Sequence, residues 1–168
     1  MNYVMKKRLL TLAIILSSYC ALASNSYYFK SLNVQNGLSQ NTVNTILQDS
    51  RGFLWFGTKD GLNRYDGYRF MVYKNVTAED WSLRNNFIRS LYEDHDGNIW
   101  VGTDQGLDIF SPKDESFRHI CLNTGGRNSP HSINTITEGP DEDIWVAVES
   151  LGVLRFSDAE SDPVVFSA

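Results

Sequence analysis

The sequence predicts an all-β protein of repeated four-stranded antiparallel units, and three observations lead to this prediction. Much of the chain after residue 24 repeats with an offset of about 45 residues. Within each unit, short runs of strand-forming residues alternate with turns that contain Gly and Asp. The second of these runs is apolar at consecutive positions, which indicates a strand buried on both faces. A period of this length with four short strands is typical of a β-propeller blade.

The repeat is seen most clearly around the tryptophans. Aligning Trp55 with Trp100 superposes many further positions at the same offset. The matched pairs are Leu38 and Leu83, Asn41 and Asn86, Asp49 and Asp94, Gly52 and Gly97, Gly57 and Gly102, Thr58 and Thr103, Gly61 and Gly106, and Leu62 and Leu107. A third, weaker copy follows with Ile133, Ile136, Ile144 and Trp145, but Glu142 replaces its turn glycine.

Each unit is expected to hold four strands. In the first unit we place them near residues 43–48, 53–58, 62–65 and 68–74, separated by turns whose glycines can adopt the positive φ of tight hairpins. The second strand should be central, with Trp55, Trp100 and Trp145 in the core of successive units. Small residues follow each tryptophan at Gly57, Gly102 and Ala147, where neighbouring blades would converge.

These observations divide the chain into five parts and predict an incomplete ring of about three blades. The parts are a signal peptide (1–23), an N-terminal strand that completes a missing last blade (24–36), a first blade (37–80), a second blade (81–125) and a divergent, truncated third blade (126–168).

The first 23 residues have the pattern of a signal peptide. Residues 6–8 are basic, residues 9–16 form an apolar run broken only by Thr11, and Ala21 and Ala23 are the small residues that signal peptidase requires. An uncleaved membrane anchor is the alternative, but the apolar run is shorter than the roughly 20 residues that span a bilayer. We therefore expect cleavage after residue 23 and export to the periplasm.

Composition and cysteine content exclude several classes. The chain has 168 residues, 42% of them hydrophobic and 21% charged, as in an ordinary globular domain. Its formal net charge is −5 and becomes more negative without the basic leader, so nucleic acid is not an expected partner. Cys20 could mark a lipoprotein, but the bulky Tyr19 before it disfavours this alternative. Cleavage leaves Cys121 alone, which excludes an intrachain disulfide.

No residue pattern indicates catalysis, a metal or a cofactor. Asp94, Asp96 and Asn98 resemble part of a calcium loop, but no glutamate closes it, and Arg51 stands in the equivalent turn of the first unit. We expect these aspartates to bond the backbone of their own hairpin turns. Cys121 has no histidine at a recognised metal-binding spacing.

The segment from Asp94 to Leu107 resembles the regulator-propeller repeat of hybrid two-component sensor proteins. Residues 48–65 resemble it too, and Asn36-Gly37-Leu38-Ser39 is similar to the start of such sensors. The resemblance implies a periplasmic sensor region of an inner-membrane receptor that responds to glycan fragments and controls genes for polysaccharide use. It also implies further blades, a β-sandwich domain, a membrane helix, a cytoplasmic histidine kinase and a homodimeric complete protein. This chain would then be an N-terminal fragment of the sensor and not itself an enzyme.

The candidate ligand-binding residues lie in loops at one end of the blades. The loop entering each inner strand and the turn between the second and third strands should share a face, and loops on a rigid scaffold commonly bind ligands. An oligosaccharide needs aromatic surface and hydrogen-bonding groups together. The candidates are Trp81, Arg84, Asn85, Lys59, Asp60, Asp104 and Gln105.

Two alternatives to a sensing module remain open. One is the N-terminal part of an exported propeller enzyme, such as a lyase or a glycosidase, with catalytic groups on other blades. The other is an inactive fragment. A downstream membrane span with kinase motifs would separate the sensor from the enzyme.

Overall fold

The structure is a computed structural model that describes residues 3–4, 7–8, 27–122 and 130–166 of the chain. It has two parts, Met1–Ser31 and Leu32–Ala168, which are considered separately because their relative placement is not determined. In the first part residues 3–4 and 7–8 are helical, and most of the predicted signal peptide lies outside the described residues. The described residues include no helix of the length and apolarity needed to cross a membrane.

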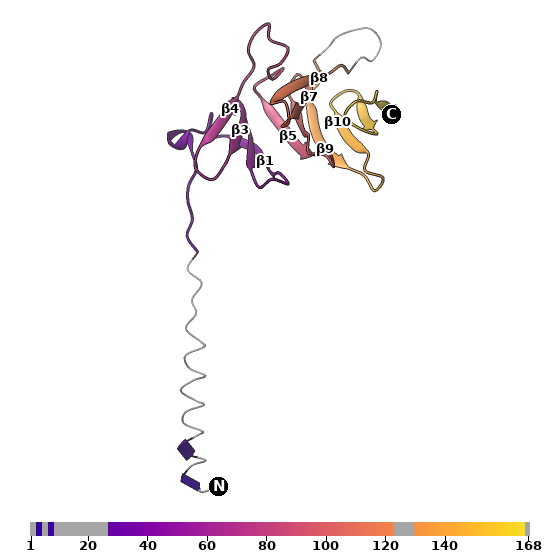
Figure 1. Cartoon of the computed structure of the whole chain (residues 1–168). Helices are drawn as coiled ribbons and strands as arrows, with labels where there is room; N and C mark the ends of the chain where they lie inside the picture. Colours follow the sequence, from indigo (N-terminus) through magenta and orange to yellow (C-terminus); the bar gives the residue numbers. More distant parts are fainter. Residues whose placement is uncertain (1–2, 5–6, 9–26, 123–129, 167–168) are drawn as a thin grey trace. The chain divides into compact units, whose positions relative to one another are not determined.

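The second part consists of three four-stranded antiparallel sheets, which confirms the predicted all-β class (Figure 1). Blade 1 contains β1 (Val43–Gln48), β2 (Leu54–Thr58), β3 (Gly61–Tyr65) and β4 (Phe70–Tyr73), preceded by the 3₁₀ turn η2 (Val34–Asn36). Blade 2 contains β5 (Ile88–Glu93), β6 (Ile99–Thr103), β7 (Gly106–Ser111) and β8 (Ser116–Ile120). Blade 3 contains β9 (Ile133–Glu138), β10 (Ile144–Val148), β11 (Gly152–Phe156) and β12 (Val164–Phe166). In each blade the strands pair in chain order, so β1, β5 and β9 are the inner strands.

The blades pack against one another through these inner strands. Strand β5 lies beside β1, and β9 lies beside β5. A Cβ atom added at Gly57 would lie 2.6 Å from Cγ2 of Ile88, and one added at Gly102 would lie 2.6 Å from Cγ2 of Ile133. The predicted role of these small residues is confirmed, because any side chain there would collide with the next blade.

Two of the three repeated tryptophans lie in the core as predicted. Trp55 and Trp100 are both 0% exposed. The Trp55 ring lies 5.3 Å from the Phe110 ring, and the Trp100 ring lies 5.2 Å from the Phe156 ring, both edge to face. Each tryptophan is therefore covered by a phenylalanine on the third strand of the following blade.

The prediction that Trp145 is an equivalent core residue is wrong for this chain. Trp145 is only half-buried. Its ring stacks on Phe166 of its own blade at 5.5 Å, and the Arg155 guanidinium lies 5.9 Å from it. The physical reason is the missing neighbour, since the described residues contain no sheet after blade 3 that could supply a covering phenylalanine.

The expected N-terminal strand is not formed among residues 27–33. These residues have no regular secondary structure, and Tyr27, Tyr28 and Phe29 are exposed. A strand requires a paired neighbour, and the described residues offer this segment none. Its pairing with a last blade stays a prediction, and residues 24–26 lie outside the described residues.

Candidate ligand-binding face

Three equivalent backbone hydrogen bonds gather the loops at one end of the blades. The N–H groups of Lys59, Asp104 and Glu149 donate to the carbonyl oxygens of Thr42, Phe87 and Ser132 at 3.3, 3.0 and 2.9 Å, respectively. Each bond joins the turn after a second strand to the loop that enters the inner strand. The expected shared face is therefore present in every blade, and we call it the loop face.

A buried carboxylate organises the loop face of blade 2. Asp108 on β7 is 0% exposed. Its Oδ2 accepts the backbone N–H of Arg84 at 2.8 Å, and its Oδ1 lies 2.7 Å from Nδ1 of His119. The Arg84 Nε lies 3.6 Å from the same Oδ1. Buried charges need such partners, so the cluster attaches the Arg84 loop to the sheet.

In blade 1 the corresponding loop is attached to the sheet by uncharged residues. There the backbone N–H of Ser39 donates to Oδ1 of the buried Asn63 at 2.8 Å. Ser39 and Asn63 occupy the repeat positions of Arg84 and Asp108. In blade 3 the position of Asp108 is held by the buried Leu154. The backbone link is thus structural, whereas the ionic groups distinguish blade 2.

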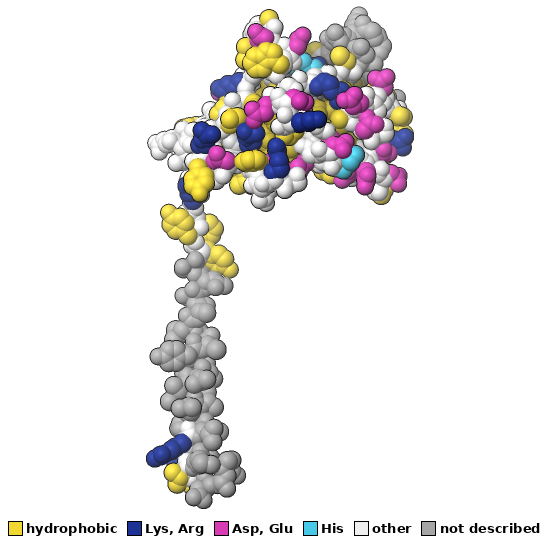
Figure 2. Space-filling model, in the orientation of Figure 1, with side chains coloured by type: hydrophobic (Ala, Val, Ile, Leu, Met, Phe, Trp, Pro, Cys, Tyr) yellow, Lys and Arg dark blue, Asp and Glu magenta, His cyan; other side chains and the backbone are white. Residues whose placement is uncertain are grey.

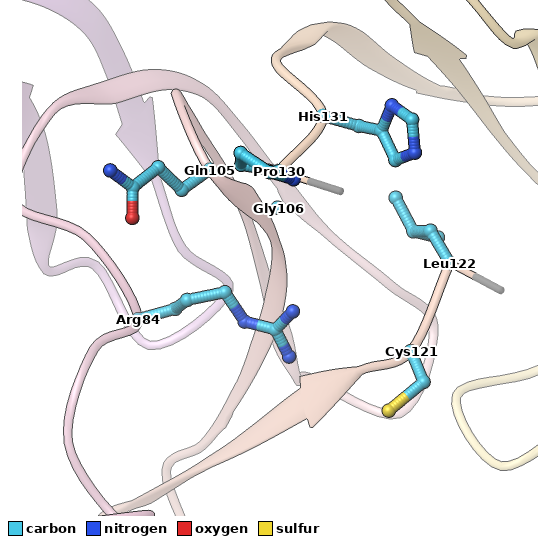
Figure 3. Close-up of a pocket in the computed structure, with 7 residues that line it drawn as sticks. All are labelled: Arg84, Gln105, Gly106, Cys121, Leu122, Pro130 and His131. Carbon is cyan, nitrogen blue, oxygen red and sulfur yellow. The ribbon is translucent and has the colours of Figure 1, made fainter. Parts of the chain in front are cut away.

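A cavity of about 400 Å³ opens beside this cluster (Figure 3). Its described lining residues are Arg84, Gln105, Gly106, Cys121, Leu122, Pro130 and His131. Two of the predicted ligand-binding residues, Arg84 and Gln105, therefore share one cavity. Cys121 and His131 are not among the residues predicted to bind a ligand. The one signal for the underlying cluster was the replacement of Ser39 and Asn63 by charged residues in the second copy.

Trp81, another predicted ligand-binding residue, does not line this cavity. Trp81 is 59% exposed, and its indole N–H donates to Glu79 Oε2 at 2.7 Å. It lines a different cavity, of about 560 Å³, together with residues of β4 and β8 such as Tyr73 and Phe117. The Trp81 carbonyl oxygen accepts the Phe117 N–H at 3.2 Å, which fixes this loop against the outer strand of blade 2. Trp81 is therefore available to solvent, but near the outer strands.

Asp104 links blades 2 and 3. Its Oδ1 accepts from Nε of Arg89 at 2.8 Å and from the hydroxyl of Ser132 at 3.0 Å. The hydrogen bond from Arg89 is the main cause that lowers the pKa of the Asp104 carboxyl, and Ser132 adds to it. These contacts hold the Asp104 carboxylate in the blade interface.

The remaining candidates have local partners. The Lys74 ammonium lies 2.6 Å from Oδ2 of Asp60, and Oδ1 of Asn85 accepts the Phe87 N–H at 2.8 Å. The Lys59 ammonium lies 6.0 Å from the Phe87 ring centroid, a cation–π distance. On the face shown in Figure 2, Lys and Arg side chains lie mainly over blade 1, and acidic side chains are denser towards blade 3.

The repeated turn aspartates are structural, as predicted. Oδ1 of Asp49 accepts the N–H groups of Arg51 and Phe53, and Oδ1 of Asp94 accepts those of Asp96 and Asn98. Each aspartate also accepts the indole N–H of its own tryptophan, from Trp55 at 2.9 Å and from Trp100 at 2.8 Å. The indole bond was not anticipated from sequence.

Competing effects set the acidity of the first of these aspartates. Burial by itself raises the pKa of Asp49, but the bonds from Trp55, Arg51 and Phe53 together lower it below its ordinary value. The carboxylate form is therefore the one that suits this turn.

These blades, with their repeated turn and tryptophan, define a β-propeller repeat protein. Residues 37–60 and 82–105 match the family described as two component regulator propeller. These two matched segments fall in the first two units, whose residues resemble regulator-propeller repeats.

Similar proteins belong to signalling systems. The histidine kinase P4 of Formosa agariphila is 40% identical over 75 residues, which cover 42% of this chain and 6% of that protein. The extracellular domain of a putative hybrid two component system from B. thetaiotaomicron is 29% identical, with a TM-score of 0.74 over 84% of this chain and 20% of that one. A second such domain from the same organism, at 20% identity and a TM-score of 0.70 over 86% of this chain and 19% of that one, shows the shared fold. The chain spans a fifth or less of each.

Proposed function

We propose that this chain is the ligand-sensing propeller part of a hybrid two-component receptor and acts in the periplasm. The observation that carries the proposal is the superposition of 84% of the chain, at 29% identity, on an extracellular domain of a putative hybrid two component system. The histidine kinase relative points to the same class of protein. In this arrangement the histidine kinase activity belongs to other parts of the receptor.

The ligand is proposed to be a glycan fragment bound at the loop face. A loop face on a rigid propeller presents hydrogen-bonding side chains without disturbing the core. Arg84 and Gln105 share a cavity there, and Trp81 adds an exposed ring elsewhere on the same connecting loop. Further blades and a β-sandwich domain of the same receptor, in a homodimer, are its proposed structural partners.

The test is a signalling assay with the full-length protein in membranes. Oligosaccharides from several polysaccharides are added one at a time, and phosphorylation of the receptor is measured. We expect one glycan class to raise phosphorylation, and Arg84→Ala to weaken this response more than Trp81→Ala. Release of new reducing ends from the added glycans, without phosphorylation, would instead support a propeller enzyme.

A further inference from the structure

The Arg84 guanidinium lies beside a buried carboxylate on one edge. Its Nε lies 3.6 Å from the buried Asp108, whose other carboxylate oxygen accepts the Arg84 backbone N–H. The side chain is 30% exposed, and its terminal nitrogens form no hydrogen bond with a described residue. Figure 3 shows the guanidinium directed into the space between Gly106 and Cys121. A guanidinium that lies beside a carboxylate on one edge, and whose terminal nitrogens form no hydrogen bond among the described residues, is suited to an incoming acceptor.

Gly106 leaves the room that this arrangement requires. A Cβ atom at this position would lie 3.0 Å from Cδ and 3.2 Å from Nη1 of Arg84. Its φ of +148° also favours glycine. In blade 1 the equivalent Gly61 faces Lys74 and the Tyr73 carbonyl oxygen instead. The turn glycine is shared by the repeat, but blade 2 uses its space to seat a guanidinium.

The surroundings of the guanidinium are suited to an anionic ligand. None of the lining residues that the structure describes is acidic, and Gln105 and His131 add polar groups to the cavity. The carboxylate that Arg84 contacts, Asp108, is fully buried and is shared with His119. Leu122 and Pro130 supply an apolar wall. A volume of about 400 Å³ is within the range of small-ligand pockets.

Blade 1 shows that a blade of this repeat can attach its loop without ionic groups. Blade 1 attaches its loop with Ser39 and Asn63 through a backbone bond of the same 2.8 Å length. A buried carboxylate and an arginine cost desolvation that the neutral pair avoids. Their presence in blade 2 alone therefore points to a task other than stability.

We propose that this cavity binds the anionic oxygens of an acidic sugar, with the Arg84 guanidinium as the main contact. The planar guanidinium matches a carboxylate or a sulfate through two parallel hydrogen bonds. Gln105 and His131 contact neighbouring hydroxyls, and Leu122 packs against the ring. The inference rests on the proposed glycan-sensing function and narrows its ligand to uronic acid or sulfated sugars.

The test is a calorimetric titration of the full-length protein with four probes. Oligogalacturonides are compared with their carboxyl-reduced forms, and sulfated agar oligosaccharides with their desulfated forms. We expect one acidic probe to bind about tenfold more tightly than its neutral counterpart, which corresponds to about 1.4 kcal/mol of binding free energy. The acidic probe that shows this preference distinguishes a carboxylate from a sulfate.

Matched variants assign the effect to the cavity. Arg84→Gln should abolish the preference for the acidic probe, whereas Arg69→Gln, which removes an equal charge from a distant hairpin turn, should retain it. Gln105→Ala, which does not touch Asp108, should weaken binding of the same probe severalfold. Circular dichroism of each variant checks that the blade remains folded.

Each outcome decides between the two proposals. Equal binding of acidic and neutral forms would overturn the anionic cavity and leave glycan sensing intact. A preference that persists in Arg84→Gln would place the anionic contact elsewhere. Binding of none of the four probes would overturn the anionic cavity, and phosphorylation in response to another glycan would still support the sensor.

Discussion

Blades 2 and 3 have the same four-stranded pairing but very different burial. Blade 2 has neighbours on both faces, and β6 is buried at every position. In blade 3, β10 alternates between buried and half-buried residues, and all of β12 is exposed. The difference shows that a propeller blade does not carry a complete core of its own. Part of its apolar surface, including its central tryptophan, is covered by the blade that follows.

The turn that precedes the second strand also differs between blades 2 and 3. Asp94 accepts the buried Trp100 indole at 2.8 Å in blade 2. Blade 3 has Gly139 at this position, and a Cβ atom there would lie 2.6 Å from Nε1 of Trp145. The indole of Trp145 thus occupies the space of the missing carboxylate. The aspartate and the deeply buried tryptophan occur together, because a buried indole N–H needs an acceptor.

The largest expected difference concerns the two tryptophans. Trp100→Ala should lower the free energy of unfolding of this chain by about 3–5 kcal/mol, because it empties a fully buried site. Trp145→Ala should cost about 1–2 kcal/mol, because part of that ring already contacts water. Urea unfolding followed by circular dichroism measures both. One protein concentration is used throughout, since the open blade faces favour self-association. Equal losses of unfolding free energy in the two variants would mean that the Trp145 ring is covered in solution.

The close approach of β6 to the inner strand β9 of the next blade predicts the next effect. Gly102→Ala should destabilise the chain by about 1–3 kcal/mol, because the added methyl group overlaps Ser90 Oγ of the same blade and Ile133 of blade 3. Ala147→Gly, at the same position of blade 3, should cost only about 0.5–1 kcal/mol through backbone entropy. The same urea experiment compares them. A neutral Gly102→Ala would show that blades 2 and 3 pack less closely than described.

A pH-dependent contact tests the interface between the same two blades. The Tyr92 hydroxyl donates to Glu138 Oε2 at 2.7 Å, and burial, followed by this bond, raises the pKa of Tyr92 to about 12. A raised folded-state pKa means that the stabilisation is complete below pH 10 and is lost as the pH rises towards 12. We expect wild type to lose stability over that window more steeply than Tyr92→Phe. Identical alkaline profiles would exclude a contribution from this contact.

The smallest effect is expected from a buried hydroxyl. Oγ of Ser90 on β5 is buried without a hydrogen-bond partner among the described residues. Ser90→Ala should therefore be neutral or stabilising by up to about 1 kcal/mol, because it removes an unsatisfied polar group. A loss of more than about 1 kcal/mol in thermal unfolding would indicate that the hydroxyl has a partner in solution.

Much of the site was visible in the sequence only as separate residues. The repeat placed Arg84 and Gln105 in loops that share a face, and the structure brings them to one cavity. It separates Trp81 from them, because the Trp81 loop pairs with Phe117 at the outer strand. Local sequence patterns do not predict that Trp81 and Arg84, which belong to one loop, line different cavities. That choice depends on contacts with distant strands.

The sequence by itself determined the blade, and the tertiary structure decided what each blade contacts. Strand positions, turn glycines and the central tryptophan follow from local preferences and a 45-residue repeat, which act within one unit. The burial of Trp145 depends on a neighbouring sheet, so equivalent sequence positions have different environments. The charged cluster at Asp108 likewise required three segments to meet: a loop, β7 and β8. Contacts of this kind join residues far apart in the chain, and local sequence patterns carry little information about them.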